Sequence, residues 1–156
     1  MKQLSGDQLF AGFFGLDKSL WRQQPAVHRL RCGNDCTSAL AQSLAGATNQ
    51  SLIWLDGDST IEGPLAVGTP QRPVVIVAGG ALTIKGPVVI HGLVYARALA
   101  WQDAAAGPAA LHGAAISEGG YQGNGTPDLV QDAAILAAIK SRSGSFARVA
   151  GSWKDF

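Results

Sequence analysis

The spacing of the hydrophobic residues divides this chain into two parts. The first part, up to about residue 50, contains apolar residues at helical spacing. Residues 5–22 predict a helix at their start, because Ser5 or Asp7 can cap its first turn. Four apolar residues follow at helical spacing: Leu9, Phe10, Phe13 and Phe14.

Two further elements are predicted before the pattern changes. Residues 25–32 alternate between apolar and polar positions, which is typical of a strand. Leucines and alanines over Thr37–Ala47 predict a second helix, with Thr37 as its cap. After Ser51 helical spacing is lost, and β-branched or aromatic runs follow. The clearest runs are Leu52–Leu55, Val74–Ala78, Val88–Ile90 and Leu93–Ala96.

These runs belong to an internal repeat. TIEGPLAV at residues 60–67 returns as TIKGPVVI at residues 83–90, 23 residues later. GPVVIHGLVYA at residues 86–96 returns as GPAALHGAAIS at residues 107–117, 21 residues later. A period near 20 residues with several short strands per period is typical of one coil of a β-helix.

We therefore predict stacked parallel strands over residues 52–117, in about three coils, with Gly63, Gly86 and Gly107 at equivalent corners. The alternative is a set of Gly-Pro turns in an ordinary β-sandwich. The repeat favours the solenoid, because the histidine and the apolar positions return in phase.

The ends of such a stack expose strand edges and need covers. The helices before residue 50 are candidates for one cap. A helix starting at Thr126-Pro127-Asp128 and running to about Ser141 is the candidate for the other. A final strand is predicted over Ser145–Val149, and Trp153 and Phe156 close the chain.

The expected fold is thus mainly β with flanking helices (α+β): a short parallel β-helix-like solenoid capped by N- and C-terminal helical segments. We expect a single domain, residues 1–156. It divides into an N-terminal helical cap (1–50), the solenoid repeats (51–120), and a C-terminal helix and strand (121–156).

The composition is typical of a folded domain, and the distribution of charge argues against nucleic acid as a partner. Hydrophobic residues make up 47% of the chain and charged residues 15%, the opposite of a disordered chain. The net charge is +1 and the cations are scattered, so we expect no nucleic-acid partner. No basic-then-apolar leader opens the sequence, and no apolar stretch is long enough to span a bilayer.

The two cysteines, Cys32 and Cys36, lie four residues apart around a Gly-Asn turn. This spacing favours a disulfide, which would indicate an oxidising compartment. A bound metal and two free buried thiols remain alternatives. A zinc site needs four ligands, and only His28 lies nearby in the sequence.

LIWLDGDST is the one local match to a catalytic motif. A strand followed by Asp56-x-Asp58-x-Thr60 opens the haloacid-dehalogenase-type phosphatases, where the first aspartate is the nucleophile. No later acidic pair is available to hold magnesium; Glu62 is the only nearby later acid. The favoured interpretation is a turn leading into the first coil, with aspartate side chains bonded to the backbone.

Other candidate side chains have structural alternatives. His91 and His112 occupy equivalent repeat positions, where they would stack as a ladder or share a metal. Ser117 has no nucleophile elbow, so no triad with His112 and Glu118 is proposed. The aromatic residues could bind sugars or pack in the core: Trp54, Tyr95, Trp101, Tyr121 and Trp153. We expect no catalytic residue, cofactor or metal.

Several motifs together resemble the C-terminal periplasmic domain of PilX-type minor pilins and pilus-assembly proteins of Gram-negative bacteria. They are CGNDCT, IWLDGD, TIKGPVVIHGLVYAR, GNGTPDLV followed by a helix, and the closing GSFARVAGSWKDF. The resemblance runs from about Leu9 to Phe156.

This resemblance implies a structural role without catalytic residues: priming of a type IV pilus, or a place at its tip. It implies other minor pilins and a tip adhesin as partners, and a location in the periplasm or on the cell surface. The family is anchored in the inner membrane by an N-terminal hydrophobic helix, which this sequence lacks.

Contacts with partners are expected from the insertions between repeats, Gly68–Arg72 and Gln102–Ala106. Trp101 borders one insertion and is the predicted interaction residue, with a place in the core as the alternative.

Overall fold

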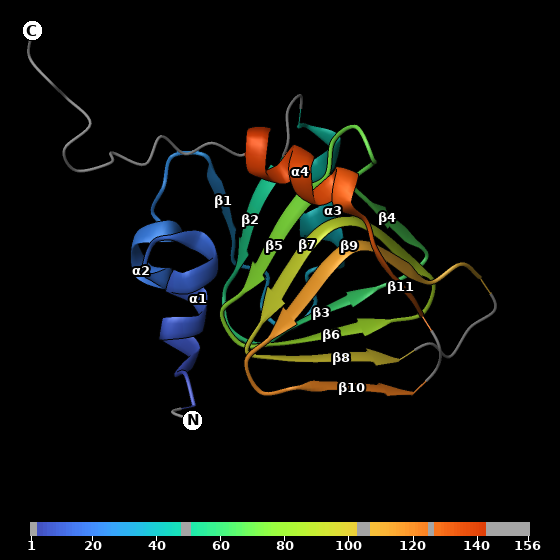
Figure 1. Cartoon of the computed structure of the whole chain (residues 1–156). Helices are drawn as coiled ribbons and strands as arrows, with labels where there is room; N and C mark the ends of the chain where they lie inside the picture. Colours follow the sequence, from blue (N-terminus) through green and yellow to red (C-terminus); the bar gives the residue numbers. More distant parts are fainter. Residues whose placement is uncertain (1–2, 48–50, 103–106, 125–126, 143–156) are drawn as a thin grey trace, which may run out of the picture.

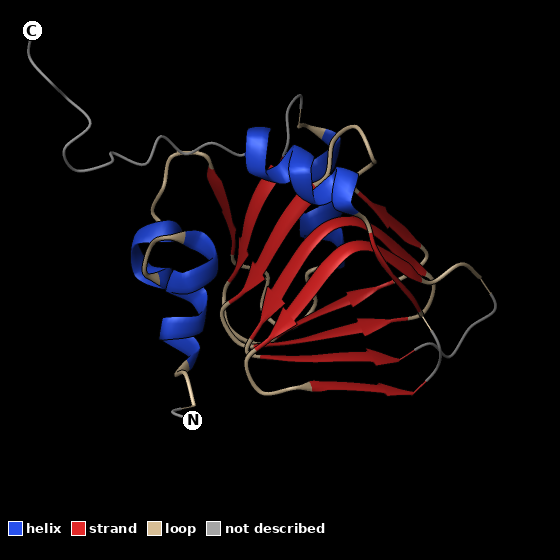
Figure 2. Ribbon diagram, viewed as in Figure 1, coloured by secondary structure: helices blue, strands red, loops and turns tan. Residues whose placement is uncertain are grey.

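The computed structural model describes residues 3–47, 51–102, 107–124 and 127–142, and shows a parallel β-solenoid with helices around it (Figures 1 and 2). The described strands pair in parallel and form three faces. The first face contains β1 (Val27–Leu30), β2 (Ser51–Leu55), β5 (Val74–Ala78) and the C-terminal halves of β7 (Val88–Ala96) and β9 (Ala110–Ser117).

The other two faces complete each turn. The second face contains β3 (Ser59–Glu62), β6 (Ala81–Lys85), β8 (Ala98–Gln102) and β10 (Tyr121–Asn124). The third contains β4 (Leu65–Val67), the N-terminal halves of β7 and β9, and β11 (Asp128–Gln131). The stack has about five turns, whereas the recognisable repeat covers three, because the first and last turns do not share its motif.

The predicted register is confirmed. Thr60 pairs with Thr83, and His91 pairs with His112. The three glycines predicted at corners all lie between the second and third faces, where Gly63 N–H donates to the carbonyl of Lys85 (2.8 Å). These parallel ladders exclude the antiparallel sandwich that was the alternative for this segment.

Two other glycines let single strands turn from one face to the next. Gly92 lies within β7 at φ 154°, where a Cβ would stand 1.8 Å from the carbonyl oxygen of Val74 in the preceding turn. Gly113, its register partner in β9, would meet the carbonyl oxygen of Gly92 at 1.9 Å. Any side chain at these positions would therefore push successive turns apart.

The hydrophobic core has two layers on either side of the first face. Inward-facing residues of all three faces fill the solenoid. Outward-facing residues of the first face pack under α1 (Gly6–Phe14), α2 (Lys18–Trp21) and α4 (Ala133–Arg142). Both surfaces of β2 and β5 are covered, which explains why their sequences are continuous apolar runs rather than alternating ones.

The helices cover the solenoid differently from the expected pair of end caps. Of the described helices, only α3 (Thr37–Ala45) closes an end: its Leu40 is fully buried in the interior core of the first turns. Figure 1 shows α1 and α2 beside the first face, and α4 lying across that face. The N-terminal cap is therefore confirmed for α3, while the C-terminal helix covers a side of the stack.

Helix α1 is capped by Ser5, one of the two predicted caps, and Ser5 forms a capping box with Gln8. The hydroxyl of Ser5 accepts from the backbone N–H of Gln8 (3.2 Å), and Gln8 Oε1 accepts from the N–H of Ser5 (3.0 Å). Gly15 ends the helix in the left-handed conformation. In α3 the N-cap is Cys36 and not Thr37, whose hydroxyl accepts from the N–H of Glu62 (2.8 Å) and joins α3 to β3.

The predicted start of the C-terminal helix at Thr126-Pro127-Asp128 is wrong. Asp128–Gln131 form β11, paired with β9, and α4 begins at Ala133, six residues after the predicted first helical residue Pro127. Asp132 caps α4, because its Oδ1 accepts from the N–H groups of Ala134 and Ile135. Parallel pairing with β9 outweighs the local helix signal. Thr126, the strand predicted over Ser145–Val149, and Trp153 and Phe156 lie outside the described residues.

The close approach at Gly92 leads to a prediction. Gly92→Ala is expected to lower the free energy of unfolding by about 2–4 kcal/mol, because the new methyl group cannot coexist with the carbonyl of Val74. Urea unfolding followed by circular dichroism measures the change. Gly12→Ala is the matched control: Gly12 lies in α1 with open space around it, and the substitution is expected to stabilise by up to about 1 kcal/mol. Equal stabilities for the two variants would contradict the proposed packing.

Candidate functional site

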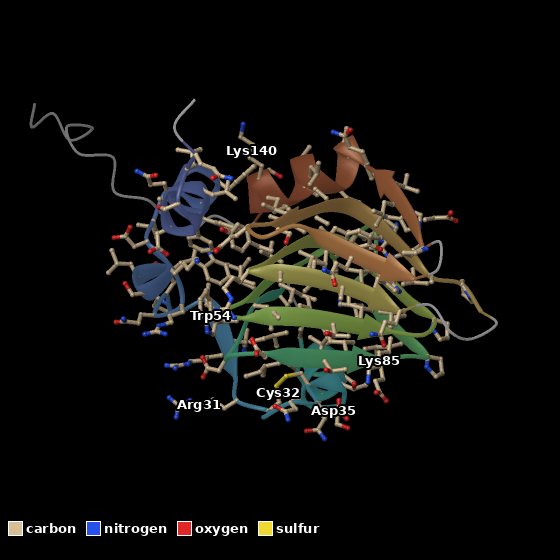
Figure 3. The ribbon with its side chains drawn as sticks, turned by 90° about the horizontal axis from the view of Figure 1, so that it is seen from below. Arg31, Cys32, Asp35, Trp54, Lys85 and Lys140 are labelled. Atoms are coloured by element: carbon tan, nitrogen blue, oxygen red, sulfur yellow. A yellow bond between two sulfur atoms is a disulfide. The ribbon has the colours of Figure 1, made fainter. Side chains whose placement is uncertain are left out.

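Cys32 and Cys36 form the predicted disulfide, with their Cα atoms 5.0 Å apart. The bridge joins the end of β1 to the start of α3, and Figure 3 shows it beside Asp35. Cys36 is fully buried, and its N–H donates to the carbonyl of Thr60 in β3 (2.8 Å). The disulfide therefore holds α3 over the first end of the solenoid. The metal and free-thiol alternatives do not apply to this pair.

The two aspartates of the phosphatase-like motif are held in separate contacts. Asp56 accepts from Nε of Arg29 (2.9 Å) and from Nε1 of Trp54 (2.8 Å). Burial alone would raise the pKa of Asp56, but these hydrogen bonds outweigh it and hold the pKa below its usual value. Asp58 accepts from the N–H of Ala81 in the next turn (2.8 Å). Asp58 agrees with the turn interpretation, in which the aspartates bond to the backbone, whereas Asp56 accepts from two side chains instead. The described residues contain no group of three metal-ligating side chains.

The two repeat histidines stack as a ladder. Their ring centroids are 4.8 Å apart and their planes differ by 9°. Burial lowers the pKa of His91, and the neighbouring His112 lowers it further. The negative charge of Asp132 acts in the opposite direction. Ser117 donates to the carbonyl of Gly120 (2.6 Å), so its hydroxyl is engaged away from this ladder.

Sequence reasoning missed a polar cluster that attaches the N-terminal helices. Tyr95 Oη lies 2.9 Å from Oε1 of Glu118, and its pKa is raised by burial and by that carboxylate. Lys18 pairs with Glu118 and, at 3.3 Å, with Asp7. Lys18 and Glu118 are 100 residues apart in the sequence, so no local pattern could have identified the pair.

Trp101 lies inside the solenoid, with 1% of its surface exposed. This contradicts the expectation that its side chain is available on the surface, and agrees with the alternative of a core residue. It occupies an inward position of β8, in register with the buried Ile84 of β6. Trp54 and Tyr95 are buried as well, so neither ring is presented to a sugar. Trp153 and the greater part of the insertion Gln102–Ala106 lie outside the described residues.

An apolar groove lies on the outer side of the first face, with a volume of about 590 Å³. One wall comes from α1 and α2, and the other from the C-terminal half of α4. Its floor is formed by Leu52, Val75 and Leu93 of three successive turns. Among the described residues that line it, Gln24 and Lys140 are the only ones with polar groups at the ends of their side chains, apart from the indole of Trp21.

The C-terminal end of the stack is a second apolar surface, which we call the open end. Ala115, Tyr121 and Leu129 sit at inward positions of the last turn, one on each face. Their register partners in the preceding turn are the buried Val94, Leu99 and Leu111. Leu129 is nevertheless 53% exposed and Tyr121 is 42% exposed, because no described element covers this end. A hollow of about 290 Å³ lies beside Leu111, Ala115 and Leu129.

Comparison with known proteins found no matching family model, no matching curated protein and no matching solved structure. None of the helices in the described ranges is long and apolar enough to cross a membrane.

The position of Trp101 leads to a prediction about stability. Trp101→Ala is expected to lower the free energy of unfolding by about 3–5 kcal/mol, because it leaves a large cavity in the solenoid. Thermal unfolding checks this. Leu20→Ala, at a half-exposed position of α2, is the control and is expected to change stability by no more than about 0.5 kcal/mol. A Trp101→Ala protein that melts like the wild type would contradict the core position.

The histidine ladder leads to a prediction about pH. Above a pH of about 6.5, His91 is neutral in both the folded and the unfolded chain. As the pH falls below this value, the unfolded chain takes up the proton more readily, because the folded-state pKa is lowered. The wild type should therefore lose more stability than His91→Gln between about pH 7 and pH 5. Urea midpoints across this range measure the difference, and parallel curves for the two proteins would count against it.

Proposed function

We propose that this chain is a structural component of a type IV pilus-type assembly, acting through protein contacts in pilus priming or at the pilus tip. The observation that carries the proposal is the open end. The stacked inward-facing residues of the solenoid end in apolar side chains that are exposed to solvent. Such an end presents both backbone edges and apolar side chains to a neighbouring protein. We expect the partners to be other minor pilins and a tip adhesin.

The asymmetry of the stack supports this choice of surface. Its first end is closed by α3, which the Cys32–Cys36 disulfide holds in place. Head-to-tail stacking of identical copies would need both ends uncovered, so a different partner fits the open end better than an endless polymer of this chain. The backbone edges of β10 and β11 are the sites where a partner strand would continue the ladders.

Two further observations agree with the proposal. A disulfide is stable in an oxidising compartment such as the periplasm, which is where the resemblance places the protein. The motifs that carry that resemblance span most of the solenoid, from the CGNDCT turn to the GNGTPDLV segment before α4. In this proposal the membrane is reached only through an N-terminal anchor of the kind that the family carries.

The test replaces an open-end residue in the source bacterium. Leu129→Lys places a charge on the apolar end surface, and we expect it to reduce co-purification of minor pilins and the number of surface pili. Leu20→Lys, an equally drastic change at an exposed position of α2, is the matched control and should behave like the wild type. Circular dichroism of both variants verifies folding. Wild-type piliation and co-purification in Leu129→Lys would reject the open end as the assembly surface.

A further inference from the structure

The floor of the apolar groove is a straight row of aliphatic side chains. The row takes one lining residue from each of five neighbouring strands, and the register of the first face joins them in the order Val27, Leu52, Val75, Leu93 and Ala114. Figure 1 shows these strands, β1, β2, β5, β7 and β9, side by side. Paired strands lie about 4.8 Å apart, so the row is about 19 Å long. The stacking of turns thus produces a linear apolar track across the first face.

Helices flank this row on both sides. Phe14 and Trp21 line the groove from α1 and α2, and Leu136 and Ile139 line it from α4. The volume between them, about 590 Å³, lies within the roughly 300–1,000 Å³ of small-molecule sites, which are mostly apolar and carry few polar groups. The groove therefore has the size and the lining of a ligand site.

The charge of the lining favours an anionic ligand. Lys140 is the only charged residue among the described residues that line the groove. Its side chain is exposed (Figure 3), and within the described ranges no ion pair joins it to a carboxylate. A negative group on a ligand would therefore find a complementary charge here, whereas a positive group would be repelled.

The shape of the groove favours a single hydrocarbon chain over a polypeptide. Val75, in the middle of the row, is only 1% exposed, so the groove is narrow there. An extended peptide would bury backbone N–H and C=O groups that this apolar lining cannot satisfy. A helix is about 10–12 Å across, so a single turn of it, about 500 Å³, would take up most of the volume. An acyl chain spans half the hydrocarbon core of a bilayer, about 15 Å, and needs no hydrogen-bond partner.

We propose that the groove binds one molecule of a long-chain fatty acid, with the acyl chain along the row and the carboxylate at Lys140. The site goes beyond the proposed function and does not depend on it. None of the three residues that define the open end lines the groove.

The first experiment tests the charge match by calorimetric titration of the full-length purified chain. Laurate is ionised at pH 8, and dodecanol has the same chain length without the charge. Laurate is expected to bind one molecule per chain, and more tightly than dodecanol. Lys140→Gln should weaken laurate binding severalfold and leave dodecanol binding unchanged. Lys85→Gln, which removes an exposed lysine of the second face, is the matched control and should bind both like the wild type.

The second experiment tests the row itself. Among saturated carboxylates from octanoate upward, each added methylene is expected to raise the affinity about fourfold, because it is removed from water, until the chain spans the row. Leu93→Trp fills part of the row and should weaken laurate binding severalfold. Leu65→Trp, at a half-buried strand position outside the groove, is the matched control and should bind laurate like the wild type.

Several results would overturn the proposal: no binding of laurate, an affinity that does not rise with chain length, equal losses for laurate and dodecanol in Lys140→Gln, or wild-type binding by a folded Leu93→Trp. Melting curves establish folding, and the ligand series on the wild type decides the question if Leu93→Trp does not fold. Leu129→Lys, the open-end variant, is expected to bind laurate normally. Failure of this site and failure of the proposed pilus role are therefore distinguishable.

Discussion

The structure depends on the parallel hydrogen-bonded ladders that join each turn of the solenoid to the one before. These ladders place equivalent residues of successive turns above one another, so that a buried position in one turn predicts an inward position in the next. A slip of one residue would send every inward side chain outward. Gly92 and Gly113 maintain the register at the bend between two faces, because a Cβ at either would meet the carbonyl of the preceding turn.

The helices around the stack cover apolar surfaces that the ladders themselves leave exposed. The first end is closed by α3 and the disulfide, and the outer surface of the first face is partly covered by α1, α2 and α4. The open end and the apolar groove are two places where described residues leave apolar surface exposed to solvent. They differ in character: the groove lies between helices of the chain over the first face, whereas the open end presents backbone edges, which suit another protein.

Charged residues attach β1 and α2 to the rest of the solenoid. Asp56 connects β1 to the turn after β2 through Arg29, and Glu118 connects α2 to the last turn through Lys18. Both carboxylates also accept from a buried aromatic side chain, Trp54 and Tyr95 respectively. Such half-buried ion pairs with additional hydrogen bonds orient the elements that they join. In the phosphatase-like motif, Asp56 has this role through Arg29 and Trp54.

The sequence by itself determined the features that local chemistry controls. The spacing of Gly-Pro and His-Gly repeats predicted the parallel register; Ser5 and Gln8 made the capping box of α1; and the four-residue spacing of the cysteines matched a disulfide. Only the tertiary structure decided features that depend on distant neighbours. Residues 128–131 are a strand because β9 offers a free edge, Trp101 points inward because Ile84 lies beneath it, and Lys18 meets Glu118 across 100 residues. Local patterns limit the conformations that each segment can adopt, but burial and pairing energies select among them, and these arise only when the turns stack.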